Sequence, residues 1–231
     1  MKTIGLLGGM SWESTQTYYR LINEGVKARL GGLHSAKMVL YSVDFAEIEA
    51  LQHKGDWAET ARILSRAARS LQDAGADFLV IGTNTMHKVA PEIEQAIRIP
   101  LLHIADATAQ VLAQDNVTTV GLLGTRFTME QDFYRQRLED AGIHVITPDQ
   151  AQRTVVHQVI YEELCRGEIN PASREAYLGI VASLAERGAQ AVILGCTEIG
   201  LLIEQADTTV PLYDTTEIHA AQAVEKALSG R

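Results

Sequence analysis

Two segments of the sequence place a small reactive side chain directly after an apolar run that ends in glycine. Phe-Leu-Val-Ile-Gly is followed by Thr83, and Ala-Val-Ile-Leu-Gly is followed by Cys196. A cysteine thiolate can serve as a nucleophile or as a general base, whereas a threonine hydroxyl needs a neighbouring group to take its proton at neutral pH. The repeated setting therefore predicts two related reactive positions, one in each half of the chain.

The internal repeat extends beyond these two segments. Residues 78–85 match residues 191–198, and residues 3–8 match residues 119–124. We therefore expect two related α/β halves and a pseudo-twofold axis that sets position 83 facing position 196. A duplicated site of that kind can address both faces of one substrate carbon.

Short runs rich in Val, Ile and Leu alternate with longer segments of helical period. Such runs are typical of parallel strands buried on both faces, and their alternation with helices indicates βαβ units. The expected strands are residues 2–8, 37–43, 78–83, 99–104, 118–124, 143–147, 191–196 and 209–213. The predicted fold is α/β, with two similar doubly wound parallel-sheet domains and the active site in the cleft between them.

The domain boundary rests on the repeat, because no linker rich in Pro, Gly or Ser separates the halves. The second half begins near residue 99, and the last strand and helix have no evident counterpart at the end of the first half. We therefore predict a first domain of residues 1–98 plus 208–231 and a second domain of residues 99–207.

In open parallel sheets, ligands bind just beyond the carboxyl ends of the strands. The segments that meet this condition are Gly8–Ser11, Thr83–Thr85, Thr125 and Cys196–Glu198. Cys196 is the strongest candidate, because a helix beginning near residues 197–199 would stabilise its thiolate and lower the thiol pKa from about 8.5. The alternative interpretation is a small buried core residue.

The residues that follow Thr83 are also open to two interpretations. Asn84 and Thr85 stand where the backbone N–H groups of a helix could receive a carboxylate, and they could equally be N-caps. His87 could shuttle a proton for Thr83 or pack on the following helix. The glycines at Gly8-Gly9 do not fit the G-x-G-x-x-G pattern, so they indicate close approach to a small ligand rather than a dinucleotide site.

Composition excludes several other classes of function. Twenty basic against twenty-nine acidic residues give a net charge of −9, which argues against nucleic acid and anionic membranes as partners. Cys165 and Cys196 are too few for a disulfide framework and show no metal-ligand spacing. No run approaches the roughly 18 apolar residues of a membrane span. We expect a cytoplasmic protein that binds a small molecule.

With these residues in view, the sequence resembles the aspartate/glutamate racemase superfamily, specifically its aspartate racemase branch. The matching segments are Gly8–Ser11, Thr83–His87, Leu123–Thr125, Gly195–Glu198 and Tyr213–Thr215. The resemblance covers essentially the whole chain. It implies two α/β domains with the active site between them, a homodimer, and catalysis with no cofactor, neither pyridoxal phosphate nor a metal.

The resemblance also implies a mechanism in which two cysteines flank Cα, one removing its proton as a thiolate and the other returning a proton on the opposite face. Cys196 corresponds to the second cysteine, and Thr83 stands in the position of the first. With one thiol, we expect an asymmetric racemase of acidic amino acids, better with one enantiomer than with the other. Glu198, where glutamate racemases usually have histidine, favours the aspartate-type branch.

The substrate-binding residues are likewise implied by the resemblance. Asn84, Thr85, Thr125 and Thr197 would hold the α-carboxylate and the amine, with Met10 in the matching glycine-rich loop. The segment around Gln52, together with Arg166, would reach the side-chain carboxylate.

Two competing functions are open. One is a decarboxylase or isomerase of the same superfamily, in which Cys196 protonates a carbanion formed by other means. The other is a binding protein for an acidic amino acid that lost catalysis with its first cysteine. Deuterium uptake at Cα separates a racemase from a binding protein, and release of carbon dioxide from malonate-type acids identifies a decarboxylase.

Overall fold

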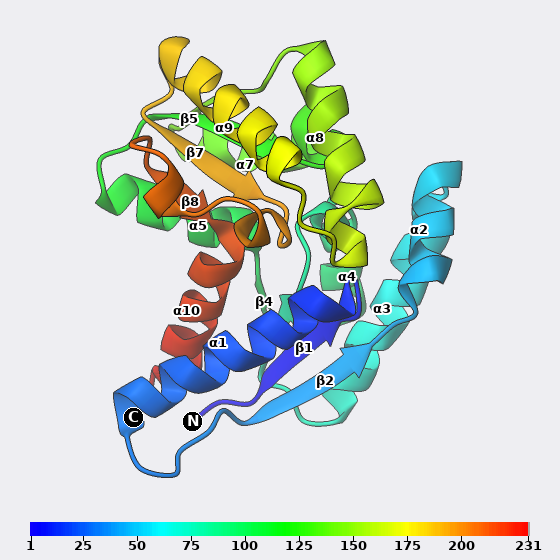
Figure 1. Ribbon diagram of the computed structural model, residues 1–231. Helices are drawn as coiled ribbons and strands as arrows, with labels where there is room; N and C mark the ends of the chain where they lie inside the picture. Colours follow the sequence, from blue (N-terminus) through cyan, green and yellow to red (C-terminus); the bar gives the residue numbers. More distant parts are fainter. Residues whose placement is uncertain (231) are drawn as a thin grey trace. The chain divides into compact units, whose positions relative to one another are not determined.

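The computed structural model describes residues 1–230 and divides into two compact units. The first unit is Met1–Ile104 together with the segment from His219 onward, and the second is Ala105–Ile218. Each unit contains one four-stranded sheet in which every neighbouring pair of strands is parallel (Figure 1). The predicted α/β class with two parallel sheets is confirmed.

The two sheets have the same strand order. The first runs β2-β1-β3-β4 and the second β6-β5-β7-β8. The strands are β1 (Ile4–Gly8), β2 (Met38–Ser42), β3 (Phe78–Ile81), β4 (Leu101–Leu102), β5 (Thr119–Gly124), β6 (His144–Ile146), β7 (Ala191–Gly195) and β8 (Leu212–Asp214). Each overlaps an apolar run that predicted it, so the internal repeat of the sequence corresponds to a repeat of topology.

The structure corrects the assignment of the fourth strand of each sheet. Sequence reasoning gave residues 99–104 to the second domain and residues 209–213 to the first. Backbone pairing instead joins Leu79 to Leu101 and Val192 to Leu212. The last strand therefore does have a counterpart in the first half, namely β4, which was hard to recognise because it is only 2 residues long.

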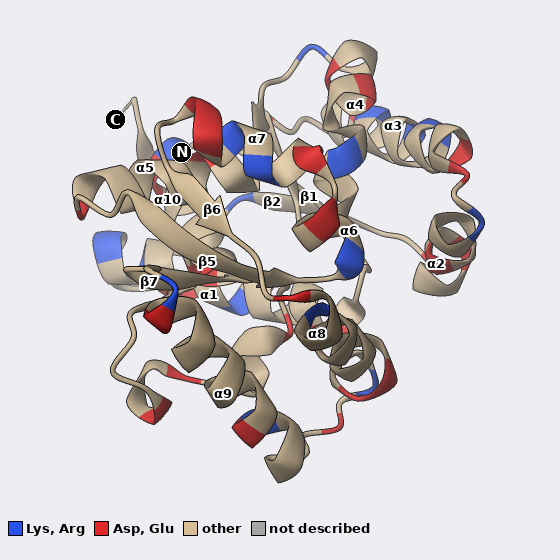
Figure 2. Cartoon of the chain, turned by 90° about the horizontal axis from the view of Figure 1, so that it is seen from above, with Lys and Arg blue, Asp and Glu red and all other residues tan. Residues whose placement is uncertain are grey.

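Helices connect the strands in both units. They are α1 (Trp12–Leu30), α2 (Phe45–Lys54), α3 (Trp57–Asp73), α4 (Ala90–Ala96), α5 (Ile104–Gln114), α6 (Arg126–Glu130), α7 (Asp132–Asp140), α8 (Gln150–Glu162), α9 (Pro171–Glu186) and α10 (Thr215–Leu228). Short 3₁₀ helices follow several elements: η1 (Thr85–Val89), η2 (Leu164–Arg166), η3 (Ile199–Leu201) and η4 (Gln205–Asp207). Basic and acidic positions both occur along α3 and α8 (Figure 2).

The first sheet is covered by helices on both faces, because successive side chains of a strand point to opposite sides. Leu6 and Val80 pack in one buried cluster with residues of α1 and α10. Leu7 and Ile81, the next residues along the same strands, pack in another cluster with residues of α3 and α4. This arrangement explains why β1 and β3 read as continuous apolar runs.

In the second unit, one buried cluster joins the sheet to the site region. Leu123 of β5 and Leu194 of β7 pack against residues of α8 and α9, and Cys196 and Ile199 belong to the same cluster. The segment that leaves β7 is therefore fixed by the core of its own unit. Among the described residues, no helix is both long and apolar enough to cross a membrane.

Candidate active site

The first set of candidate residues lies where β1 and β3 end. The backbone N–H of Gly82 donates to the carbonyl oxygen of Leu7 at 2.8 Å, so Thr83 leaves the sheet beside the Gly8-Gly9 turn. Gly9 has φ +91°, and a Cβ atom there would lie 2.3 Å from the carbonyl oxygen of Val43. Only glycine fits this turn. We call Gly8–Ser11 with Thr83–Thr85 the first strand-end set.

Hydrogen bonds to the backbone fix the position of Thr83. Ser14 of α1 donates its hydroxyl to the carbonyl oxygen of Gly82 at 3.1 Å. His87 Nδ1 donates to the carbonyl oxygen of Thr83 at 2.8 Å, and His87 Nε2 accepts from the backbone N–H of Ile104 at 3.3 Å. The imidazole of His87 is therefore neutral, with both nitrogens bound to backbone. These two hydrogen bonds hold the His87 ring against the Thr83 carbonyl group.

The Thr83 side chain is half-buried. The next two residues, Asn84 and Thr85, are buried at the start of η1. Met10 is also buried, and its side chain packs with Ile48 of α2 in the core of the first unit.

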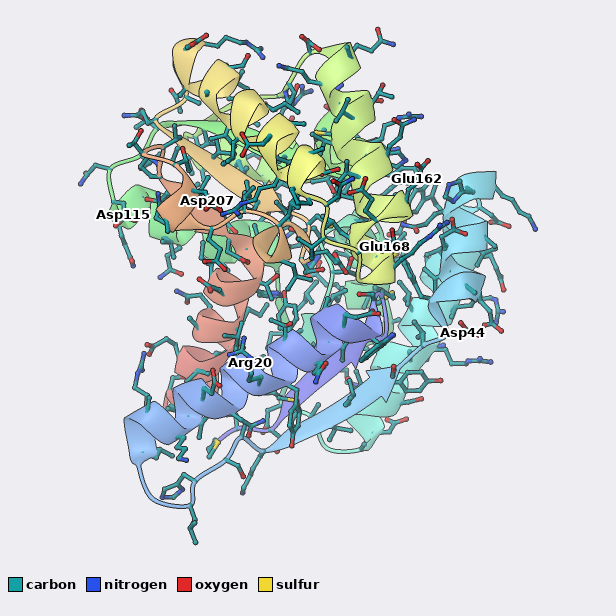
Figure 3. The ribbon with its side chains drawn as sticks, viewed as in Figure 1. Arg20, Asp44, Asp115, Glu162, Glu168 and Asp207 are labelled. Atoms are coloured by element: carbon teal, nitrogen blue, oxygen red, sulfur yellow. The ribbon has the colours of Figure 1, made fainter. Side chains whose placement is uncertain are left out.

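Gln52 lies on α2, which begins after the N-cap Asp44 (labelled in Figure 3). Its side chain is only 2% exposed. Among the described residues, its amide oxygen Oε1 has no hydrogen-bond partner. An unpaired buried amide oxygen costs free energy, so Gln52 is a polar group that a bound ligand could satisfy.

The second set of candidate residues lies where β5 and β7 end. Gly124 and Gly195 are paired across these strands, so Thr125 and Cys196 leave the sheet at the same edge. A Cβ atom on Gly195 would lie 2.6 Å from the carbonyl oxygen of Leu123, which explains the glycine at this position. Thr125 is buried and caps α6, its hydroxyl accepting from the backbone N–H of Thr128. We call Thr125 with Cys196–Glu198 the second strand-end set.

Cys196 and Glu198 are joined directly in the second strand-end set. The thiol of Cys196 donates to Glu198 Oε2 at 3.0 Å, and the hydroxyl of Thr197 donates to the same oxygen at 2.7 Å. Cys196 is 7% exposed and Glu198 is 4% exposed. Burial raises the pKa of the Cys196 thiol well above its usual value, and the Glu198 carboxylate raises it further.

The expectation of a lowered thiol pKa was wrong. The residues after Cys196 form only a turn and the short 3₁₀ helix η3, which begins at Ile199, so no long helix points its amino terminus at the sulfur. Burial and the neighbouring carboxylate decide the sign. These two effects favour the thiol of Cys196, which can donate a proton, over the thiolate.

Cys165 and Arg166 lie on η2, between Glu162 and Glu168 (both labelled in Figure 3). Cys165 is half-buried and packs against the same cluster as Cys196, as expected for a packing residue. Arg166 is exposed. Burial raises the pKa of the nearby Tyr177 hydroxyl well above its usual value, and the charges of Cys196, Glu163 and Cys165 act in the same direction.

Comparison with known proteins decides the family. A sequence profile described as Asp/Glu/Hydantoin racemase matches residues 7–223. The chain belongs to the Asp/Glu/hydantoin racemase family. This membership confirms the expected resemblance and the expected enzyme class, an isomerase of the amino-acid racemase type.

Individual members of the racemase family match along nearly the whole chain. A provisionally assigned Asp/Glu racemase from Yersinia pestis is 59% identical, with a TM-score of 0.93 over 99% of this chain and 100% of that one. An aspartate racemase homologue from Pyrococcus horikoshii is 34% identical, with a TM-score of 0.85 over 98% and 99% of the two chains. The broad specificity amino-acid racemase RacX of Bacillus subtilis is 24% identical over 98% of each chain.

Within this racemase-family chain, the structure divides the predicted site residues between the two units. Met10, Gln52, Thr83, Asn84 and Thr85 belong to the first unit. Thr125, Arg166, Cys196 and Thr197 belong to the second. Among the described residues, no group of three or more His, Cys, Asp or Glu side chains is arranged to hold a metal ion.

Sequence reasoning missed the part that Glu198 plays. It used Glu198 only to choose a branch of the racemase superfamily, whereas the structure gives its carboxylate two hydrogen bonds from the adjacent residues. The available signal was a carboxylate two positions after a reactive cysteine, in a segment too polar for a strand. The chain turns after β7, and this turn places the side chains of Cys196 and Glu198 within hydrogen-bonding distance.

Proposed function

We propose that this protein is a cofactor-independent racemase of acidic amino acids, aspartate or glutamate, in which Cys196 and Thr83 exchange protons at Cα. When Cys196 acts as the base, its thiolate takes the Cα proton and forms an S–H bond, and the electron pair stays on the substrate as a carbanion. When Cys196 acts as the acid, its thiol returns a proton to the carbanion. Thr83 is assigned the same exchange on the other face.

One observation carries the proposal: Thr83 and Cys196 occupy the same place in a repeated topology. Each follows the third strand of a sheet whose order is the same in both units, and each stands directly after a glycine. A racemase needs two proton-transferring groups with equivalent surroundings, since it must work on both enantiomers. The repeated sheets supply such a pair, and the family membership fits it.

The difference between the two groups supports an asymmetric enzyme. A thiol ionises near pH 8.5 even before its surroundings act, whereas an aliphatic hydroxyl needs a base beside it. His87 is the nearest candidate base along the chain, and both of its ring nitrogens are bound to backbone. We therefore propose that the enantiomer deprotonated by Cys196 exchanges its Cα proton faster than its mirror image.

The substrate class is the finer part of the proposal. Asn84, Thr85, Thr125 and Thr197 are assigned to the α-carboxylate and the amine, and Gln52 and Arg166 to the side-chain carboxylate. The relative RacX is named for broad specificity, so neutral and basic amino acids belong in the test. A homodimer and a cytoplasmic location remain parts of the same proposal.

The test follows the Cα–H signal by proton NMR in D₂O. L- and D-aspartate and L- and D-glutamate are incubated with the native protein, beside a panel of neutral and basic amino acids. We expect loss of the Cα–H signal for one acidic enantiomer with the native protein and with Cys165→Ala, and retention of that signal with Cys196→Ala. The Cys165→Ala control removes a cysteine from the same core without removing the proposed acid–base group.

Other outcomes separate the alternatives. Exchange confined to neutral or basic amino acids would keep the racemase and overturn the acidic substrate class. A substrate that raises the melting temperature without any exchange would replace the enzyme by a binding protein. Release of carbon dioxide from a malonate-type acid, dependent on Cys196, would identify a decarboxylase.

A further inference from the structure

A cavity of about 400 Å³ lies in the second unit, beside β7, β8 and the start of α10, which are labelled in Figure 1. Part of its lining is apolar and consists of Leu194, Ile203 and Leu212. Leu194 is 2% exposed and Ile203 is 1% exposed, so this part reaches the core. All the residues that line the cavity belong to the second unit. Small-molecule sites have this size and this apolar character, with a few polar groups for orientation.

The polar part of the lining is acidic. Asp214, Glu217 and Glu204 contribute carboxyl groups, and among the described residues that line the cavity none is basic. Gln205 also lines it, but its amide is engaged elsewhere: Nε2 donates to two backbone carbonyl oxygens, and Oε1 accepts from a backbone N–H. The side chains of the lining therefore present negative charge to a ligand and no positive charge.

Asp214 has one oxygen that is explained by the fold and one that is not. The backbone N–H groups of Thr216 and Glu217 both donate to Oδ1, at 2.8 Å and 3.3 Å, as expected for an N-cap of α10. The other oxygen, Oδ2, lies against Gly200, where an added Cβ atom would be 2.3 Å away. The neighbouring Thr216 is 1% exposed, and within the described part of the chain its hydroxyl has no hydrogen-bond partner.

The burial of Asp214 works against its charged form. Burial raises the pKa of this carboxyl group to about 6, although the two backbone N–H groups act in the opposite direction. The charge of Glu217 adds to the rise. A buried carboxylate is normally paired with a cation, and the described lining of the cavity supplies none. A carboxyl group perturbed in this way inside a cavity is a common feature of binding sites.

We propose that this cavity, which we call the β7–β8 cavity, binds a small organic ammonium ion. The N–H groups of the ligand donate to Asp214 Oδ2 and to the Glu217 carboxylate, and its alkyl part lies on Leu194 and Leu212. Hydrogen bonds between a cation and a carboxylate are about twice as strong as neutral ones. An acidic amino acid would bring further carboxylates toward Asp214, so this ligand is not the proposed racemase substrate. The inference goes beyond the proposed function and does not depend on it.

The lining favours an organic cation over a metal ion. Among the described residues, no group of three or more His, Cys, Asp or Glu side chains is arranged to hold a metal. The Glu204 carboxylate is already engaged, since it accepts from the backbone N–H of Asp207 in a capping box. Apolar side chains supply no oxygen ligand to a hard cation, whereas they gain from covering an alkyl chain.

The test titrates the protein with n-butylammonium chloride and follows the backbone amide signals by two-dimensional NMR at pH 7.5 and constant ionic strength. We expect saturable shifts of the signals of Gly200 and Glu217. Two control compounds separate the contributions of chain and charge. 1-Butanol has the same chain without the charge, and tetramethylammonium has the charge without N–H donors. Both should bind at least tenfold more weakly than n-butylammonium.

Three variants locate the binding. Asp214→Asn removes the charge but keeps an oxygen for the N-cap, and it should weaken n-butylammonium binding at least tenfold. Gly200→Ala keeps the charge and places a methyl group against Oδ2, so it should weaken binding to a similar extent. Glu186→Gln removes an exposed carboxylate at the end of α9 and should leave the affinity unchanged.

Several results would overturn the proposal. One is the lack of saturable shifts in the native protein, and another is undiminished binding by Asp214→Asn. Equal binding of 1-butanol would show a cavity that does not recognise charge. Tighter binding of magnesium chloride at the same signals would identify a metal site instead. None of these measurements uses racemase activity, so failure of the proposed function and failure of this inference are distinguishable.

Discussion

At the scale of single residues, the decisive competition in this protein is between burial and local dipoles at Cys196. A helix amino terminus is worth about 0.3–1 kcal/mol to an adjacent anion, which is less than one pKa unit. Full burial can move a pKa by several units, and here a carboxylate lies 3.0 Å from the sulfur. Burial and the carboxylate therefore outweigh any local dipole, and the pKa of the Cys196 thiol is raised.

The sequence could locate Cys196 and Thr83 at strand ends, because the glycine-terminated apolar runs are local features. It could not give the direction of the shift in the Cys196 pKa, which depends first on how deeply the thiol is buried and then on the Glu198 carboxylate beside it. Nor could it give the hydrogen-bond partners of His87. One of these partners is the backbone N–H of Ile104, 17 residues further along the chain.

Replacement of Thr83 by cysteine tests the source of the asymmetry. We expect Thr83→Cys to accelerate Cα–H exchange of the slower enantiomer by at least tenfold, because a thiol ionises far more readily than a hydroxyl. The matched control is Thr83→Val, which keeps the shape and removes the hydroxyl. It should abolish any residual exchange of the slower enantiomer and leave exchange of the faster one. NMR rates that respond equally for both enantiomers would contradict this assignment.

At the scale of elements, the strands were predictable and their partners were not. Runs such as Val192–Leu194 identify buried strands by composition alone, since both faces of a parallel sheet are covered. Pairing is a long-range property. Leu212 is paired with Val192 of the strand that precedes it in the chain, and Leu101 is paired in the same way with Leu79. Recognition of β4 would have required knowing that the second sheet repeats the order of the first.

The glycine turn after β1 offers a test of how tightly an element end is constrained. We expect Gly9→Ala to destabilise the protein by more than Gly55→Ala. Both glycines have positive φ, which costs an alanine roughly 1–2 kcal/mol. At Gly55 the new Cβ meets no atom within 4 Å, whereas at Gly9 it meets the Val43 carbonyl oxygen at 2.3 Å.

Urea denaturation at pH 7 measures this difference. Overpacking of a rigid site typically lowers the free energy of unfolding by about 1–3 kcal/mol. The Gly9→Ala protein should therefore be less stable than the Gly55→Ala protein by about that amount. Equal losses would show that the turn after β1 relaxes more easily than the backbone contact indicates.

At the scale of the whole molecule, the buried residue His219 makes stability depend on pH. His219 is fully buried; its Nε2 donates to the carbonyl oxygen of Leu102 at 2.8 Å, and its Nδ1 accepts from the Tyr18 hydroxyl at 2.8 Å. The rings of His87 and His103 lie with their centroids 4.4 Å apart, and His87 lies 5.9 Å from His219. A proton added here would have to charge an imidazole inside the core of the first unit.

The direction of the pH dependence follows from the pKa values. Burial lowers the pKa of His219 from 6.5 to about 4. Between these values the unfolded chain binds a proton that the folded chain does not, so the free energy of unfolding falls as the pH falls from 6.5 to 4. The expected loss is roughly 3 kcal/mol. In the second unit, burial raises the pKa of Asp214 from 3.8 to about 6. This shift has the opposite effect on stability. The stability that Asp214 contributes is present below pH 3.8 and is lost as the pH rises through about 6.

These opposite slopes can be separated by two conservative substitutions and urea denaturation between pH 4 and pH 7.5. His219→Gln can keep a donor toward Leu102 and an acceptor for Tyr18 but cannot titrate, so it should flatten the loss of stability on the acid side. Asp214→Asn keeps an oxygen for the backbone N–H groups of Thr216 and Glu217, and should be about 1 kcal/mol more stable than the parent at pH 7.5. If the His219 variant keeps the full acid-side slope, the proton that destabilises the fold is bound elsewhere, and the remaining buried histidines, His87 and His103, become the groups to replace.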